Sequence, residues 1–367
     1  MKILYTESSP NMGGQEMQAL TQMQAFREQG HAVVLACRKY SKISFNAERL
    51  GIPVCYIPFR NSLHLPSVYR LLQFMHRFSP DMVICHSGHD SNTVGIARLV
   101  LSVTRRPPRV IRQKTYLTGK IKPFSLNYLN DVLIVPGHDI RDRLVQAGCS
   151  SEKITVIAPG FNFKRMCREA EGPLPAHIRS WLKLSGDAPV IVQVGMLRPE
   201  KGHDFMLKVL AQLKVKGRAF RYLIVGSGSP EAERAIGAEI TALKLWDRVY
   251  MTGSVYPVMP VYRQADLVVM PSRKETFGMV VVEASSLGVP VFASQVGGLP
   301  DIIRHGVSGI LLPVDSPDEW RAAMCDFLDN PDCYRRLAVR ARVDVEARFT
   351  IHRVVADIVA LGKGLSG

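Results

Sequence analysis

Short apolar runs alternate with amphipathic stretches along the whole chain of 367 residues. The runs have the length of buried strands, and the stretches between them have the apolar spacing of helices. Buried strands separated by helices indicate parallel sheets that are covered by helices on both faces. Predicted strands of the first half lie in MKILYT, HAVVLAC, IPVCYIP, DMVICH, PRVIRQ, VLIVP and KITVIA. The pattern therefore predicts an α/β fold with doubly wound sheets.

The alternation is interrupted at residues 164–175, where KRMCREAEGPLP is charged and ends in Gly and Pro, and we interpret this segment as a linker. Beyond it, predicted strands lie in PVIVQVG, RYLIVG, RVYMTG, DLVVMPS, PVFAS and GILLP. We expect an N-terminal domain at 1–170, a second domain at 171–345 and a C-terminal segment at 346–367 that returns to the first domain. Predicted helices span 14–30, 44–50, 66–77, 139–147, 205–216, 230–243, 277–287 and 344–361. Two such domains would face each other across a cleft, where the carboxyl ends of the strands bind ligands.

The composition is that of a globular protein, with 47% apolar and 22% charged residues. No apolar run approaches the length that spans a bilayer, and MKILYTESSP turns polar too early for a signal-peptide core. Seven scattered cysteines without a CxxC pair suit a reducing compartment. We therefore expect a cytoplasmic protein.

The net charge of +15 is concentrated in the first half. Residues 1–165 hold 22 Lys/Arg against 10 Asp/Glu, whereas the remainder holds 25 against 22. A basic half suits an anionic partner, such as nucleic acid, an acidic lipid surface or a phosphorylated acceptor. A solvated surface kept soluble by its charge explains it equally well. No zinc finger or aromatic RNA-stacking motif is present, so we expect no nucleic-acid partner.

Two carboxylates, Glu275 and Glu283, lie seven residues apart in RKETFGMVVVEA. In a largely helical segment this spacing separates their backbones by ~12 Å. Paired glycosidase carboxylates lie ~5 Å or ~6.5–9.5 Å apart. The two acids are therefore not expected to act on one bond.

The spacing suits an elongated ligand with hydroxyl-rich ends and an anionic middle. Between the acids, the backbone N–H groups of Phe277, Gly278 and Met279 lie at a predicted helix start, where a phosphate binds well. A sugar, a diphosphate and a ribose fit this order. A capping acid and an incidental surface Glu explain the spacing equally well.

The stretch RKETFGMVVVEASSLGVPVFASQVGGLPDII resembles the E-x7-E region of retaining glycosyltransferases of family 4, which have the GT-B fold. The similarity extends to MKILYTESSPNMGGQE, VGMLRPEKGHD, YLIVGSGSPE and VSGILLP, and it is most specific over residues 190–313. The resemblance implies two Rossmann-like domains, with a nucleoside-diphosphate-sugar donor in the second and an acceptor in the first.

The resemblance also implies roles for individual residues. Glu275 would contact hydroxyls of the transferred sugar, Glu283 those of the ribose, and the backbone of Phe277–Met279 the diphosphate. Arg198 and Lys201 would neutralise the departing diphosphate, whose developing charge dominates the barrier. A solvated basic loop is the alternative explanation of these two cations.

Glycine-rich loops give further donor-binding candidates by the same resemblance. Gly13 and Gly14 would approach the donor phosphates, and Gly226 and Gly228 would lie beneath the nucleotide, although each pair also suits a plain turn. The backbone of residues 252–255 would hold the base. NMGGQE lacks the full GxGxxG, which argues against an NAD-dependent dehydrogenase. We interpret Asp301 in GGLPDII as an ordinary acid at a helix start.

The acceptor side departs from the family pattern. Where relatives often carry a histidine, VIRQKTY offers Arg112, Gln113 and Lys114. Arg112 or Lys114 would bind an acidic group of the acceptor. CHSGHD is interpreted as a polar loop, with His86 a further acceptor-side candidate and too few ligands for a metal. The chain also lacks a DxD motif, so we expect neither a metal nor a cofactor.

The sequence thus predicts a hexosyltransferase-like enzyme that moves a sugar from a nucleoside diphosphate to an acceptor hydroxyl with retention. The family implies a front-face displacement, in which the leaving phosphate oxygen takes the acceptor's proton. The charge suits a glycan or lipid-linked acceptor, as in lipopolysaccharide synthesis, at the inner face of the cytoplasmic membrane. The alternatives are a nucleotide-sugar epimerase on the same scaffold and a non-catalytic protein that binds nucleotides or a membrane surface.

Overall fold

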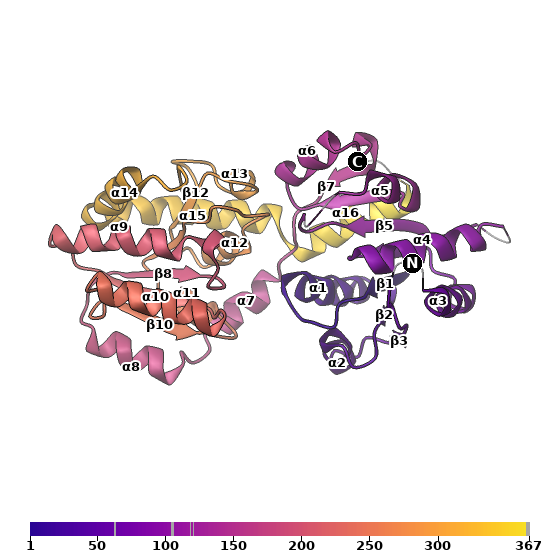
Figure 1. The fold of residues 1–367 in the computed structure, drawn as a ribbon, viewed down its shortest axis with the longest axis horizontal. Coiled ribbons are helices and arrows are strands. Elements are labelled where there is room, and N and C mark those ends of the chain that lie inside the picture. The colour runs from indigo at the N-terminus through magenta and orange to yellow at the C-terminus, as the bar shows by residue number, and fades with distance from the viewer. Residues whose placement is uncertain (62–63, 104–105, 118, 120, 365–367) are drawn as a thin grey trace. The chain divides into compact units, whose positions relative to one another are not determined.

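The computed structural model describes residues 1–61, 64–103, 106–117, 119 and 121–364, and the chain forms two compact units (Figure 1). The first unit contains Met1–Phe161 and the chain from Phe349 onward, and the second contains Asn162–Arg348. The strands of the first unit are β1 (Lys2–Glu7), β2 (Ala32–Cys37), β3 (Val54–Tyr56), β4 (Met82–Cys85), β5 (Arg109–Gln113), β6 (Val132–Val135) and β7 (Ile154–Val156). Its helices are α1 (Gly14–Glu28), α2 (Lys42–Arg49), α3 (Leu65–Phe78), α4 (Gly88–Leu101), α5 (Pro123–Leu129), α6 (His138–Gln146), the 3₁₀ turn η1 (Ser151–Lys153) and α16 (Ile351–Lys363).

The second unit repeats this alternation of strands and helices. Its strands are β8 (Val190–Val194), β9 (Arg221–Val225), β10 (Val249–Gly253), β11 (Leu267–Met270), β12 (Val291–Ser294) and β13 (Ile310–Leu312). Its helices are α7 (Phe163–Ala170), α8 (Ala176–Leu184), the 3₁₀ turn η2 (Pro199–Lys201), α9 (His203–Val215), α10 (Pro230–Ala242), α11 (Met259–Tyr262), α12 (Met279–Ser286), α13 (Leu299–Ile302), α14 (Pro317–Asp329) and α15 (Pro331–Arg348).

Each unit is built on one parallel sheet. The strand order is β3-β2-β1-β4-β5-β6-β7 in the first unit and β10-β9-β8-β11-β12-β13 in the second. All pairings between these strands are parallel. In both sheets the order reverses beside the first strand of the unit, which is the position where open α/β sheets bind ligands. The predicted strands and the parallel α/β architecture are confirmed.

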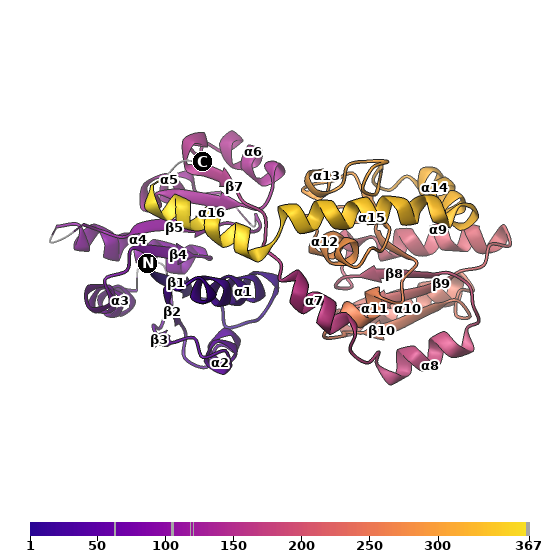
Figure 2. The same cartoon turned by 180° about the vertical axis from the view of Figure 1, so that it is seen from behind.

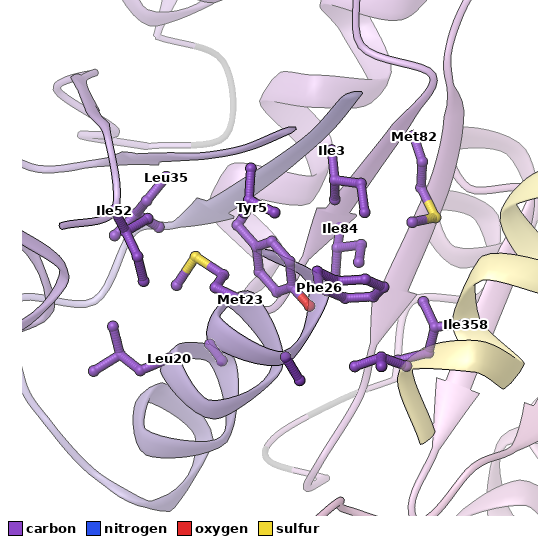
Figure 3. Packing of buried hydrophobic residues seen from close by; sticks show 14 of the residues in the cluster. Ile3, Tyr5, Leu20, Met23, Phe26, Leu35, Ile52, Met82, Ile84 and Ile358 are labelled. Atoms are coloured by element: carbon purple, nitrogen blue, oxygen red, sulfur yellow. The ribbon is translucent and has the colours of Figure 1, made fainter. Parts of the chain in front are cut away.

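The apolar runs of the first unit are buried on both faces of its sheet. Ile3 and Tyr5 pack against α1 and α16, whereas the intervening Leu4 belongs to the cluster under α3 and α4. Figure 3 shows Tyr5 beside Phe26 of α1, and the two ring centroids are 6.1 Å apart. This two-sided burial explains why β1 reads as a continuous apolar run.

The core of the second unit lies between its sheet and helices α9 and α14. The indole of Trp320 on α14 is fully buried, contacts Phe205 edge to face and donates from Nε1 to the carbonyl of Pro313 at 3.0 Å. Figure 2 shows α9 and α14 on one side of this sheet. The unit thereby buries an aromatic core of its own.

Helices α5, α8 and α14 are not among the predicted helices, and three further segments differ from the sequence-based expectation. Most of the predicted linker 164–175 is helical, because α7 occupies residues 163–170 and packs its apolar side against α11. The predicted helix 344–361 is two helices, because the chain is extended at Thr350, where it forms a bridge to Phe161.

The third segment is CHSGHD, for which the sequence predicts a polar loop. Ser87 instead caps α4, which begins at Gly88, and the carboxylate of Asp90 accepts from the Ser87 N–H at 3.0 Å. A Ser three residues before an acid is the signature of such a cap. The helix was missed because polar residues precede its apolar face.

Candidate active site

Lys201 and Glu275 meet at the carboxyl ends of the strands of the second unit. Lys201 ends η2 after β8, and Glu275 lies in the loop after β11. The Lys201 Nζ is 2.7 Å from Oε2 of Glu275, with the side chains 25% and 13% exposed. The other carboxylate oxygen accepts the Thr276 N–H at 3.0 Å. The structure therefore brings together the two side chains that the sequence assigned to the diphosphate and the sugar.

A buried polar chain holds the backbone of Lys201. The hydroxyl of Tyr222 donates to Oε1 of Gln193, and Nε2 of Gln193 donates to the carbonyl oxygen of Lys201 at 2.8 Å. Both side chains are buried. Sequence reasoning missed these positioning residues, although a glutamine inside the apolar run PVIVQVG was a usable signal.

His203 gives the same loop a second fixed point. Its Nε2 donates to the carbonyl oxygen of Met196 at 3.2 Å. Burial lowers the pKa of His203 to about 4, so the ring is neutral near pH 7. The loop between β8 and α9 is thus anchored at both ends by buried side chains.

Arg273 ties the loop after β8 to the loop after β11. Its guanidinium donates to Asp204 at 2.9 Å, to Asp315 at 2.9 Å and to the carbonyl oxygen of Pro199 at 2.8 Å. These hydrogen bonds raise the pKa of Arg273, whose charge is therefore permanent.

Arg198, in contrast, is exposed and lies 3.8 Å from Glu200, so it is not held beside Glu275.

Helix α12 begins at Met279 and not at the predicted Phe277. Gly278 is the capping residue with φ of 108°, and Phe277 is buried before it. The amides of the first turn therefore belong to Met279 and Val280. The prediction of a helix start between the two acids is confirmed, with its first residue two positions later.

The loop after β12 closes on the segment that carries Glu275. A Cβ added at Gly297 would lie 1.7 Å from the carbonyl oxygen of Glu275, and the φ of Gly297 is 55°. The N–H of Gly298 donates to the same oxygen at 3.3 Å. The pair of glycines in VGGLP therefore permits a backbone contact that fixes Glu275.

Glu283 lies in the middle of α12. Its Oε2 accepts from the hydroxyl of Tyr262 at 2.9 Å. Burial raises the pKa of Glu283, and the hydrogen bond from Tyr262 opposes that shift. One carboxylate oxygen is thus held by Tyr262, which sequence reasoning did not identify.

The glycine-rich loop after β9 lies against the loop after β8. A Cβ at Gly226 would be 2.0 Å from the carbonyl oxygen of Gly195, so only glycine allows the approach. Gly228 packs in the same way on Leu197. The hydroxyls of Ser227 and Ser254 are 2.6 Å apart, which connects this loop to residues 252–255.

The first unit places the remaining candidates in two locations. Gly13 and Gly14 are exposed at the start of α1, where the Gly13 N–H donates to Glu16 at 2.8 Å. His86, Arg112 and Lys114 line one cavity of about 250 Å³ at the carboxyl ends of β4 and β5. The three acceptor-side candidates therefore share a site.

His86 is neutral within this cavity wall. Its Nε2 is 3.1 Å from Oε1 of Gln113, and its Nδ1 is 3.9 Å from the buried carboxylate of Glu7. Burial lowers the pKa of His86 and raises that of Glu7 to about 8. Glu7 was another residue that the sequence did not single out.

In the parts of the chain that the structure describes, no three His, Cys, Asp or Glu side chains gather as a metal would require. His89, the other histidine of CHSGHD, is exposed on the first turn of α4. The described helices are also all too short or too polar to cross a membrane.

Comparison with known proteins finds a matching family model for each of the two units. The model of Glycosyltransferase Family 4 matches residues 12–165, and that of Glycosyl transferases group 1 matches residues 177–344. A D-inositol 3-phosphate glycosyltransferase of Segniliparus rotundus is 36% identical over 213 residues, which are 57% of this chain and 46% of that protein. The chain thus spans about half the length of the curated relatives it matches.

Solved structures agree on the fold over the whole chain. Anabaena HepE in complex with UDP has a TM-score of 0.83 at 21% identity, with all of both chains covered, and its complex with UDP-glucose scores 0.80. The lipopolysaccharide outer core galactosyltransferase WaaB has a TM-score of 0.72 at 18% identity, with 98% of each chain covered. At these identities the likeness concerns the fold alone. From its two family matches and its two parallel-sheet units, the chain belongs to the family 4 glycosyltransferases with the GT-B fold.

Proposed function

We propose that the protein transfers a sugar from a nucleoside-diphosphate sugar to a hydroxyl of an acceptor, with retention at the anomeric carbon. The observation that carries this proposal is the 2.7 Å contact between Lys201 and Glu275 beside the first turn of α12. It joins a cation suited to a diphosphate and an acid suited to sugar hydroxyls at the ligand-binding edge of a parallel sheet.

The donor occupies this edge in a defined order. Its diphosphate is bound by the Lys201 ammonium, the Arg198 guanidinium and the first amides of α12, where the helix dipole favours negative charge. Glu275 accepts from hydroxyls of the sugar, and Glu283 accepts from the ribose. Lys201, released from Glu275 by the donor, then stabilises the charge of the leaving group.

The reaction is a front-face displacement. The bond from the anomeric carbon to the phosphate oxygen breaks, and a bond to the acceptor oxygen forms on the same face. The acceptor's proton moves to the leaving phosphate oxygen, so that no protein nucleophile is required. The protein positions the reactants and stabilises the separating charge, and the step needs no metal ion.

The acceptor is an anionic glycan precursor. Support comes from the basic first half, from relatives named for D-inositol 3-phosphate and from the lipopolysaccharide galactosyltransferase with the same fold. We place the protein in the cytoplasm, working at the inner face of the cytoplasmic membrane in the synthesis of lipopolysaccharide or another lipid-linked glycan.

Helix α3 offers a means of contact with such a surface. Leu65 and Tyr69 are 76% and 61% exposed, and the basic Arg70 follows them. Apolar side chains beside a cation suit the interface of an anionic bilayer. Sedimentation with phosphatidylglycerol vesicles at low salt, and its loss at high salt, tests this placement.

Donor binding and turnover test the central proposal. A thermal-shift panel of UDP-, GDP- and ADP-sugars identifies the donor base, because a bound ligand raises the melting temperature. Nucleotide release that depends on an added acceptor, in the presence of a chelator, distinguishes a metal-independent transferase from an epimerase. A donor that binds without turnover over a broad acceptor panel would reject the enzymatic function.

A further inference from the structure

The cavity of the first unit has an unusual charge balance. It encloses about 250 Å³ and is lined by Arg112, Lys114 and the first turn of α4, among others. None of its lining residues in the described part of the chain is an Asp or Glu. Arg112, Lys114 and the exposed Lys122 are therefore three cations that line a cavity without an acidic side chain among its described lining residues.

Arg112 is the most unusual member of this lining. It is the fourth residue of β5, and only 7% of its surface is exposed. Its Nε is buried without a hydrogen-bond partner, and no ion pair to its guanidinium is found among the described residues. Burial lowers the pKa of Arg112, which reports the cost of desolvating the charge. A buried guanidinium of this kind is stabilised by an anion from outside the chain.

Asp90, the acid whose charge acts most strongly on Arg112, is already hydrogen-bonded to other groups. Asp90 is fully buried, and its carboxylate accepts from the hydroxyl of Thr6 at 2.8 Å, from the N–H of His86 at 3.2 Å and from both the N–H and the hydroxyl of Ser87. These bonds occupy both carboxylate oxygens. Asp90 moderates the charge of Arg112 at a distance and leaves its buried Nε without a hydrogen-bond partner among the described residues.

Helix α4 adds a favourable dipole to the same cavity. Its 14 residues begin at Gly88, and the first two, Gly88 and His89, line the cavity. A Cβ at Gly88 would approach NH2 of Arg112 to 3.6 Å, so the helix start and the guanidinium are neighbours. The amides and the dipole of a helix start attract anions, and here a buried cation faces the same space.

Lys114 supplies the second positive charge. It lies just beyond β5, and burial followed by repulsion from Arg112 lowers its pKa to about 8. Two like charges held together in a half-buried site favour a doubly negative ligand over a singly negative one. A phosphate monoester meets this requirement and also matches the fork of a guanidinium.

We propose that this cavity binds the phosphate group of the acceptor, with Arg112 and Lys114 as its cationic ligands. The proposal rests on the proposed function in so far as the bound molecule is the acceptor. The phosphate has two possible sources, a soluble sugar phosphate or the headgroup of a phospholipid. Both present the same tetrahedral anion to Arg112.

The test is a calorimetric titration of the full chain carrying Lys201→Ala with inorganic phosphate, so that donor-side binding does not contribute. Adding Arg112→Gln is expected to weaken phosphate binding about tenfold or more, and adding Lys114→Ala about threefold to tenfold. Adding Lys42→Ala, which removes an exposed lysine of the same unit, is the control and leaves the affinity unchanged. Equal affinities in all variants, or no phosphate binding by the parent chain, would overturn the proposal.

Because Arg112 is buried, thermal unfolding is used to check that Arg112→Gln folds. If it does not fold, the phosphate affinity of the variant at the half-buried Lys114, Lys114→Ala, tests the proposal. Glucose 6-phosphate and vesicles containing phosphatidic acid are then compared as competitors for the phosphate. If phosphate displaces glucose 6-phosphate only when Arg112 is present, the bound group comes from a soluble sugar phosphate. If phosphate displaces the vesicles only when Arg112 is present, the bound group comes from a phospholipid headgroup. If neither binding depends on Arg112, the proposal fails.

A separate titration of the unmodified chain with UDP keeps the two proposals apart. UDP binding without phosphate binding refutes the cavity assignment alone. Phosphate binding that depends on Arg112, without binding of UDP, GDP or ADP in parallel titrations, refutes the donor assignment alone.

Discussion

The donor-side loops of the second unit and the cavity of the first unit hold their charges in opposite ways. Lys201 is paired with Glu275, and Arg273 is paired with two aspartates, so the donor-side loops carry internally balanced charges. Arg112 and Lys114 have no ion-pair partner among the residues that the structure describes, and burial lowers the pKa of both. The comparison teaches that one site is positioned before its ligand arrives, whereas the other is stabilised by its ligand.

The largest expected effect comes from breaking the pair at the donor site. Lys201→Ala and Glu275→Gln should each lower kcat/KM for sugar transfer about 10³-fold, because each removes a group that stabilises the separating charge or holds the sugar. Lys274→Ala, which removes the exposed lysine next to Glu275, is the matched control. Steady-state kinetics measures the effect. Wild-type transfer by both variants would reject the site.

The second effect concerns the backbone that supports Glu275. Gly297→Ala places a Cβ into the 1.7 Å gap at the Glu275 carbonyl and forces an L-residue into the left-handed region. We expect a loss of about 2–4 kcal/mol in the free energy of unfolding and a large loss of donor binding. Gly217→Ala, at a left-handed turn where nothing lies within 4 Å, separates the backbone cost from the clash. Equal stability of the two variants would show that the contact does not constrain the loop.

The sequence predicted the sheets well, because buried parallel strands are continuous apolar runs that need no tertiary information. The resemblance to family 4 implied that Lys201 and Glu275 share a site, and the structure brings the two side chains together. The sequence could not predict Gln193, Tyr222 or Tyr262, since a polar side chain inside an apolar segment has a known role only when its partners are located. The unpaired state of Arg112 was likewise hidden, because its environment is made by α4, a helix that the apolar pattern did not indicate.

The third effect tests the buried chain beneath Lys201. Gln193→Leu leaves the hydroxyl of Tyr222 and the carbonyl of Lys201 without their partners. We expect a cost of about 2–3 kcal/mol in the free energy of unfolding, and a fall in kcat with a smaller change in KM, because Lys201 loses its fixed position. Gln295→Leu, an exposed glutamine of the same unit, is the control. Rescue of kcat by the double change Gln193→Leu with Tyr222→Phe would contradict a positioning role.

The smallest expected effect is the pH dependence of the free energy of unfolding that Glu7 and His86 cause beside the cavity of the first unit. The carboxyl of Glu7 has a pKa of about 8 in the folded protein, against 4.5 as its ordinary value, because burial and the nearby Asp90 disfavour its charge. The folded state therefore binds an extra proton between these values, and its stability falls as pH rises. The neighbouring His86 has a lowered pKa, so below 6.5 the unfolded state binds the extra proton and stability rises with pH.

The two contributions offset each other below pH 6.5, and only that of Glu7 remains between 6.5 and 8. The free energy of unfolding should therefore decline in this window, by at most about 1.4 kcal/mol per pH unit. Glu7→Gln cannot ionise, so its stability should decline less than that of the wild type from pH 6.5 to 8, and Lys114, whose pKa is lowered to about 8, should make it rise slightly near pH 8. The exposed Glu28→Gln should decline like the wild type. Urea unfolding at pH 6.5, 7.2 and 8 measures the difference. A wild-type decline in Glu7→Gln would mean that another group causes the decline, and that the Glu7 carboxyl is already ionised at neutral pH beside His86.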